Sequence, residues 1–293
     1  MASTQDIRRR IKSIRNIGQL TKAMQMVAAS KMRKAQQHAL AGRPYAQLMN
    51  RVLVSLQQRT DSKLHPLLQV REVKRELIIV VSTDKGLAGS LNTNLLREAA
   101  NFEASKTEFI VVGRKARQFL ARTGREIVAD FELRDAPAFA ETKAIAQFAT
   151  ERFLSGGVDR VSVLYTHFIN TINQKPIVHT MLPITDFDVM GAEDTKNTAA
   201  DGSSDPMGGY IFEPNPEAVL DVMLPYYLQY EVFQMILDAR ASEHSARMVA
   251  MKNATDNAQQ LIKDLTLEYN KMRQASITTE LLEISTAQMA LGT

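Results

Sequence analysis

The chain has 293 residues, a formal net charge of +4 and 45% hydrophobic residues, but only 6% aromatic residues and no tryptophan. It contains no cysteine, which excludes disulfides, thiolate catalysis and zinc–thiolate sites. The longest purely apolar run covers about Leu77 to Val81, far shorter than the ~20 residues of a membrane span. The N-terminal apolar residues are spaced rather than contiguous, unlike those of a signal or transit peptide. We therefore expect a soluble, cytoplasmic protein.

Positive charge is concentrated at the N-terminus. Residues 1–40 hold nine Lys and Arg residues against Asp6 alone, a net charge of +8, which leaves −4 for the rest of the chain. Such an asymmetry predicts that the basic section meets an acidic partner.

The N-terminal residues 1–60 have the pattern of a long amphipathic helix. Ser3 to Asp6 matches a helix-capping pattern, and proline is absent until Pro44. The predicted apolar stripe comprises Ile7, Ile11, Ile14, Ile17, Leu20, Met24, Val27, Ala28, Met32 and Ala35, and resumes at Leu48, Val52 and Leu56. Two ordinary bundle helices remain the simpler alternative to a coiled coil.

Between the two terminal segments, residues 75–190 change to the pattern of an α/β domain. Strands are predicted at Glu76 to Ser82, Glu108 to Gly113, Arg125 to Phe131, Arg160 to Thr166 and Pro176 to Leu182. Helices are predicted at Asn94 to Ala104, Lys115 to Arg122 and Ala140 to Leu154. This alternation favours a Rossmann-like, open, mainly parallel five-stranded sheet with helices on both sides. Residues 191–210 are poor in apolar side chains and are predicted to be a flexible loop.

The C-terminal residues 211–293 predict a second, longer helix, with Asn215 as its N-cap and Pro216 at its first position. Apolar or small residues recur in steps of three and four, which is typical of a coiled-coil seam. They are Leu228, Val232, Met235, Ala239, Ser242, Ala246 and Val249, followed by Ala258, Leu261, Leu265, Tyr269, Met272 and Ala275. A helix this long needs a partner, and an antiparallel pair with the N-terminal helix is the simplest one.

Candidate chemistry is sparse. The loop from Ser82 to Asn92 follows the first strand, where a doubly wound fold holds phosphate, but its glycines Gly86 and Gly89 fit neither phosphate-binding motif and equally suit a tight turn. The five histidines show no metal-ligand spacing, and no nucleophile elbow occurs. We therefore predict no catalytic residue, cofactor or metal.

Polar residues within the C-terminal helix carry more information. One group interrupts the predicted stripe and another lies near the end of the helix, so we expect hydrogen bonds to a partner there, although register-setting polar residues in a coiled coil are the alternative. The groups are Arg247, Asn253, Thr255, Asp256 and Asn257, and Arg273, Gln274, Ser276, Thr278, Thr279 and Glu280.

Three stretches resemble the gamma subunit of F-type ATP synthases of the bacterial type: IRRRIKSIRNIGQLTKAMQMVAASKMRKAQ near the N-terminus, STDKGLAGSLN, and ASEHSARMVAMKNATDNAQQLIKDLTLEYNKMRQASITTELLEI. The resemblance covers essentially the whole chain. It implies a rotor shaft, a left-handed antiparallel coiled coil inside a ring of alpha and beta subunits, with the α/β domain beside the epsilon subunit and the membrane ring of c subunits. Catalysis would occur on beta, so this chain would be a non-catalytic, peripheral subunit on the cytoplasmic face of the bacterial inner membrane.

The resemblance also implies contact residues for the beta subunit. Met24, its neighbour Lys22, and Arg247 correspond to the contact with the beta lever, and Arg273, Gln274 and Thr278 to the segment that touches the catch loops of beta. Two other hypotheses remain open at this point. One is a nucleotide-binding α/β enzyme whose helical arms serve dimerisation, and the other is a basic coiled coil for nucleic acid, which lacks the interleaved aromatic residues expected of one.

Overall fold

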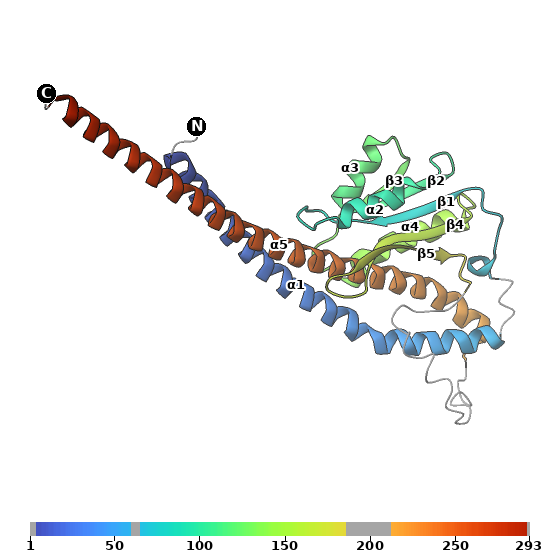
Figure 1. The fold of residues 1–293 in the computed structure, drawn as a ribbon. Coiled ribbons are helices and arrows are strands. Elements are labelled where there is room, and N and C mark those ends of the chain that lie inside the picture. Colours follow the sequence, from blue (N-terminus) through green and yellow to red (C-terminus); the bar gives the residue numbers. More distant parts are fainter. Residues whose placement is uncertain (1–3, 60–64, 186–211, 292–293) are drawn as a thin grey trace. The chain divides into compact units, whose positions relative to one another are not determined.

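The computed structural model describes residues 4–59, 65–185 and 212–291 (Figure 1). The chain forms two compact units, one of residues 1–28 with 247–293 and the other of residues 29–246. The helices are α1 (Thr4–Arg59), η2 (Pro66–Leu68, a 3₁₀ turn), α2 (Leu91–Ala100), α3 (Arg114–Arg122), α4 (Phe139–Leu154) and α5 (Pro216–Leu291). The strands are β1 (Glu76–Val81), β2 (Thr107–Val112), β3 (Ile127–Phe131), β4 (Arg160–Phe168) and β5 (Gln174–Leu182).

The second long helix begins where the sequence predicts, and both long helices continue past their prolines. The Asn215 side-chain Oδ1 accepts a hydrogen bond from the Ala218 N–H at 2.7 Å, so the predicted N-cap is confirmed. Pro44 and Pro225 lie inside α1 and α5 without ending them. The predicted cap at Ser3 and the predicted loop at 191–210 lie outside the described residues.

The sheet of the second unit has the order β3-β2-β1-β4-β5. Strands β1 to β4 pair in parallel, and only the β4–β5 pair is antiparallel. The predicted open, mainly parallel five-stranded sheet is therefore confirmed. The continuous apolar runs of β1 and β2 are buried on both faces, as the sequence indicated.

Each face of this sheet has its own core. On one face, Ile78 and Val80 of β1 pack with residues of α2 and α3, such as Leu95 and Leu120. On the other face, the alternate β1 residues pack with α4 and with the parts of α1 and α5 that belong to this unit. The parts of the long helices within residues 29–246 are thus components of the α/β core.

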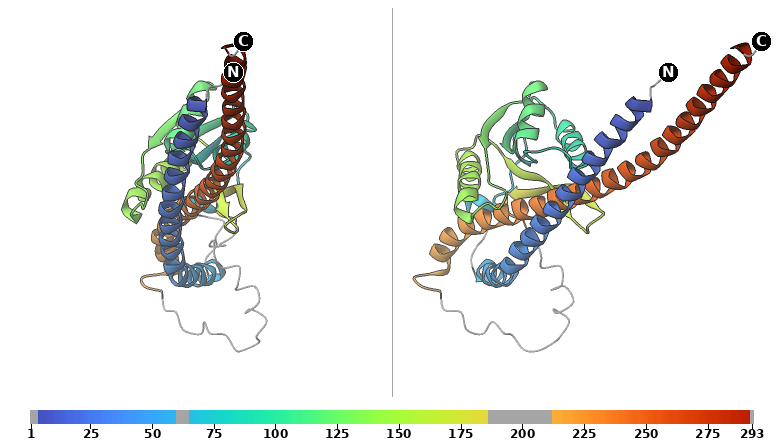
Figure 2. Two further views of the ribbon diagram at one scale, coloured as in Figure 1. Left: turned by 60° about the vertical axis from the view of Figure 1, so that its left-hand side comes forward. Right: turned by 90° about the vertical axis from the view of Figure 1, so that its left-hand side faces the viewer.

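The first unit is an antiparallel pair formed by the beginning of α1 and the end of α5 (Figure 2). Its buried stripe on α5 includes Met251, Thr255 and Ala258. The sequence-based stripe was wrong at Leu261, which is 48% exposed, whereas Ile262 is half-buried. Among the polar residues predicted to interrupt the seam, Thr255 is buried in it and Arg247 is half-buried, whereas Asn253, Asp256 and Asn257 are exposed.

Candidate partner-contact surface

Two close contacts fix the register of the antiparallel pair. The hydroxyls of Thr21 and Thr255 are 2.7 Å apart, and a Cβ on Gly18 would lie 3.5 Å from the Cβ of Ala258. Gly18 lies three residues before Thr21 and Ala258 three residues after Thr255, so one register accounts for both contacts. It places Met24 level with Lys252, and Thr4, the first residue of α1, level with Met272 of α5.

The predicted contact residues Lys22, Met24 and Arg247 form a lower group in this unit. Lys22 is exposed, and both Met24 and Arg247 are half-buried. With Met24 level with Lys252, the three residues lie within about 10 Å of each other along the coil axis, at ~1.5 Å per residue. The group combines a thioether with two cations, which suits a partner that offers both apolar and acidic groups.

Arg273, Gln274 and Thr278 form an upper group on α5, beyond the level of Thr4. All three are exposed, and the Thr278 hydroxyl donates to the Gln274 carbonyl oxygen at 2.9 Å. Arg273 lies about 32 Å along the helix from Lys252, again at ~1.5 Å per residue. The six predicted residues therefore share one unit but occupy two levels.

An exposed apolar strip on α1 was missed by the sequence reasoning. Ile17, Leu20 and Val27 were predicted to lie in the seam, but they are 52%, 61% and 56% exposed. The seam runs through Gly18 and Thr21 instead, because small residues allow the close approach of two helices. Ile17, Leu20 and Val27, called the outer strip below, share one side of α1 with Met24 in steps of three and four and so enlarge the lower group.

In the loop from Ser82 to Asn92 of the second unit, polar side chains form hydrogen bonds within the loop and to the start of α3. The Ser82 hydroxyl accepts from the Ala116 N–H at 2.9 Å and so holds the start of α3. The Thr83 hydroxyl donates to the Lys85 carbonyl oxygen at 2.7 Å and accepts from the Asn92 amide at 2.8 Å. Several of the loop's side-chain polar groups are therefore used to shape the loop itself.

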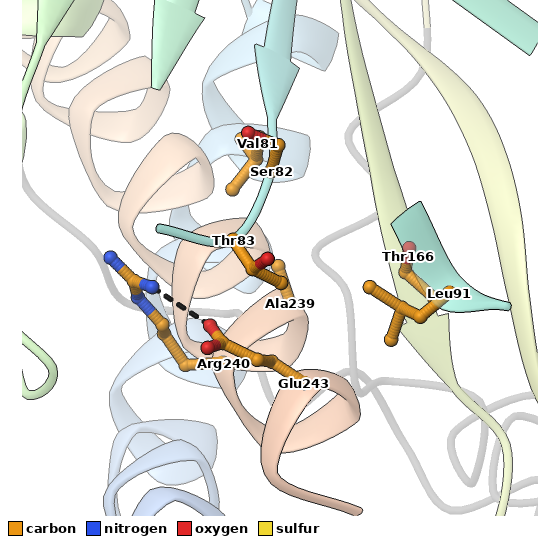
Figure 3. Close-up of a pocket in the computed structure, with 8 residues that line it drawn as sticks. All are labelled: Val81, Ser82, Thr83, Leu91, Thr166, Ala239, Arg240 and Glu243. Atoms are coloured by element: carbon orange, nitrogen blue, oxygen red, sulfur yellow. Dashed lines mark hydrogen bonds and ion pairs between the residues drawn. The ribbon is translucent and has the colours of Figure 1, made fainter. Parts of the chain in front are cut away.

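Arg240 and Glu243 of α5 fill the place where a doubly wound fold holds its ligand (Figure 3). The Arg240 guanidinium donates to Glu243 at 2.8 Å, to Asp84 at 3.4 Å and to the Leu133 carbonyl oxygen at 3.3 Å. The remaining cavity has a volume of about 10 Å³, enough for about one water molecule. This geometry weighs against the hypothesis of a nucleotide site in the Ser82–Asn92 loop.

Other kinds of site receive no support from the described residues. None of their helices has an apolar stretch long enough to cross a bilayer. No group of three potential His, Cys, Asp or Glu ligands comes together in the described part of the chain.

Comparisons with known proteins agree with the coiled pair and its α/β domain. A family model described as ATP synthase matches residues 3–291. The ATP synthase gamma chain of Opitutus terrae is 51% identical and that of Methylacidiphilum infernorum 48% identical, with alignments covering at least 99% of each chain. A chain from the central stalk and c-ring structure of the Tetrahymena thermophila mitochondrial ATP synthase is 26% identical, with a TM-score of 0.59, and 80% of this chain and 99% of that one are covered. One from the Euglena gracilis mitochondrial enzyme shares the fold at 21% identity and a TM-score of 0.67, covering 98% and 94%. The chain therefore belongs to the ATP synthase gamma chain family.

Proposed function

We propose that this chain is the central rotor shaft of an F-type ATP synthase, which couples proton flow through the membrane sector to conformational change at the catalytic subunits. The observation that carries this function is the full-length identity of about half to gamma chains. The antiparallel pair of α1 and α5 supports it, because a two-stranded coil is a stiffer transmission than one helix. The chain is a non-catalytic subunit, and nucleotide turnover occurs on beta.

The partners follow from the same assignment. The chain acts with the ring of alpha and beta subunits, the epsilon subunit and the c-ring, and requires no nucleic acid. The related structures are a central stalk with its c-ring and an F1 assembly with a c-ring, which supports these partners. Its membrane association is peripheral and through the complex, and we place the complex with this chain on the cytoplasmic face of the bacterial inner membrane.

The mechanism is a population shift imposed by an asymmetric shaft. One shaft cannot present the same face to three beta subunits, so each is held in a different conformation. Changing a beta subunit from 1:99 to 99:1 between two states requires about 5.5 kcal/mol of differential contact energy. Each charge that crosses 100 mV supplies roughly 2.3 kcal/mol, so several charges per ATP are sufficient.

We assign the beta contacts to both levels of the first unit. At the lower level, Lys22, Met24 and Arg247, with the outer strip beside them, offer apolar and cationic groups to an acidic segment of beta. At the upper level, Arg273, Gln274 and Thr278 offer exposed hydrogen-bonding groups on α5. The exposure of Lys22, Arg273, Gln274 and Thr278 and the concentration of positive charge in residues 1–40 support the assignment. The segment boundaries at residues 60, 75, 190 and 211 remain predictions.

The upper level is tested by Arg273→Ala combined with Gln274→Ala. We expect the ATPase rate of the reconstituted alpha–beta–gamma complex to fall about tenfold, the effect of about 1.4 kcal/mol of lost differential contact, while the complex still assembles. The matched control is Gln118→Ala with Arg122→Ala, because both residues are exposed on α3, in the other unit. Size-exclusion chromatography reports assembly, and ATP-driven proton pumping reports coupling. Unchanged turnover and pumping would remove these two residues from the contact, whereas failure of the wild-type chain to assemble would contradict the rotor function.

A further inference from the structure

Two histidine–carboxylate pairs join the β4–β5 hairpin to α5. The His179 Nε2 atom on β5 lies 2.6 Å from the Glu231 Oε1 atom, and the His167 Nδ1 atom on β4 lies 2.7 Å from the Asp238 Oδ2 atom. Glu231 and Asp238 are seven residues apart on α5, about two turns, so both carboxylates point toward the hairpin. The register of the sheet places Val163 opposite His179 and Lys175 opposite His167, so both histidines project from the same face.

Buried groups surround the pairs, so the protonation state of the pairs affects the stability of the contact. Glu231 is only 4% exposed, and burial raises the pKa of its carboxyl, opposed by the hydrogen bond and charge of His179. Tyr165 of β4 is buried between the two pairs, and burial, followed by the charges of Asp238 and Glu231, raises the pKa of its hydroxyl. The Phe168 N–H donates to Asp238 at 3.3 Å. The other charged residue on this face of the hairpin is Lys175, which is exposed.

We propose that His167 and His179 are positioning residues that fasten the β4–β5 hairpin to α5 in a proton-dependent way. The inference rests on the proposed rotor function in one respect, since the fastened α5 is then the element that carries torque. Protonated imidazoles make charge-assisted bonds to Glu231 and Asp238, whereas neutral imidazoles make weaker ones. The hairpin is thus held more firmly at lower pH.

The sign of the pH dependence follows from the buried pair. Burial raises the pKa of the Glu231 carboxyl, so the folded pair of Glu231 and His179 holds a proton that this carboxyl has released in the unfolded chain. This contribution to stability is present at low pH and is lost as the pH rises through the folded pKa of the carboxyl. Rising pH therefore loosens the contact.

Hydrogen exchange in the assembled complex measures this fastening. After correction for the intrinsic pH dependence of exchange, we expect the protection of the β5 amides to fall about tenfold between pH 5.5 and 8.5, the effect of one pKa unit of linkage. The test variant combines His167→Gln and His179→Gln with Glu231→Gln and Asp238→Asn, whose amides keep neutral hydrogen bonds while no member of either pair titrates, so its protection should be independent of pH. His38→Gln is the control, because His38 is exposed on α1 and should leave the wild-type slope unchanged.

The outcomes separate this inference from the rotor function. A flat wild-type profile, or a slope retained in the fourfold variant, would overturn the proton-dependent fastening even though the complex assembles and turns over ATP. Should the fourfold variant be poorly assembled, Glu231→Gln combined with Asp238→Asn provides the second test, because it removes the carboxylates and keeps their shape. That variant should have a smaller slope than the wild type, and an unchanged slope would again contradict the inference.

Discussion

Gly18 offers the sharpest test of the helix pair, because two substitutions there should act in opposite directions. A Cβ at this position would lie 3.5 Å from the Cβ of Ala258, which is an ordinary van der Waals contact. Gly18→Ala therefore fits without displacement and removes the cost of glycine in a helix, about 1 kcal/mol. Gly18→Leu places further carbon atoms in the same space, and overpacking of this kind costs about 1–3 kcal/mol.

Local hydrogen exchange across α1 residues 7–28 and α5 residues 251–272 measures both effects. We expect Gly18→Ala to raise protection roughly fivefold. Gly18→Leu should lower it by up to roughly 30-fold, because the ~1 kcal/mol gained by removing glycine offsets part of the overpacking cost. Gln19→Leu is the control, because Gln19 is the next residue and is exposed. If alanine lowers protection, or if leucine is tolerated as well as in the control, then Gly18 does not lie in the seam and the register given by Thr21 and Thr255 is wrong.

Two further predictions concern the second unit. Arg240→Leu removes the guanidinium that donates to the buried Glu243 and to Asp84, so we expect the free energy of unfolding to fall by about 3–5 kcal/mol. Denaturant titration measures this change, and a loss below about 1 kcal/mol would show that the cluster contributes little. The hydrogen bond from Lys31, followed by the charge of Lys31 and of other nearby cations, outweighs burial and lowers the pKa of the Asp135 carboxyl. The contribution of this carboxyl to stability is therefore present at neutral pH and is lost as the pH falls below about 4. We expect Asp135→Asn to make the fall of the thermal unfolding midpoint with decreasing pH shallower. An unchanged fall would refute this.

Local patterns were sufficient to predict most of the elements. Asn215 followed by Pro216 marks a helix start that depends on a single turn, and the structure places it there. The strands from Glu76 and Arg160 were found because continuous apolar runs between turn residues indicate burial on both faces. Such signals are local, so they can be recognised without knowing which helices and strands pack against each other.

The seam and the buried polar contacts could not be predicted in the same way. Hydrophobicity favoured Ile17 and Leu20 as seam residues, but the close approach of two helices selected Gly18 and Thr21 instead. The spacing of about 3.5 residues per turn that runs from Ile7 through Gly18 to Thr21 was the signal in the sequence that could have identified the seam. The pairing of His179 with Glu231 joins residues from different elements, and nothing in either local sequence indicates the partner.

The upper part of α5 has a consequence for the order in which the complex is built. In the described part of the chain no residue of α1 lies level with residues 273–291, and Ile277, Leu281 and Ile284 there are exposed. Most of the stability of a helix in a protein comes from tertiary packing of its apolar face. We therefore expect this segment to be fully ordered only when partner subunits cover it, and we expect proteases to cleave the free chain there first.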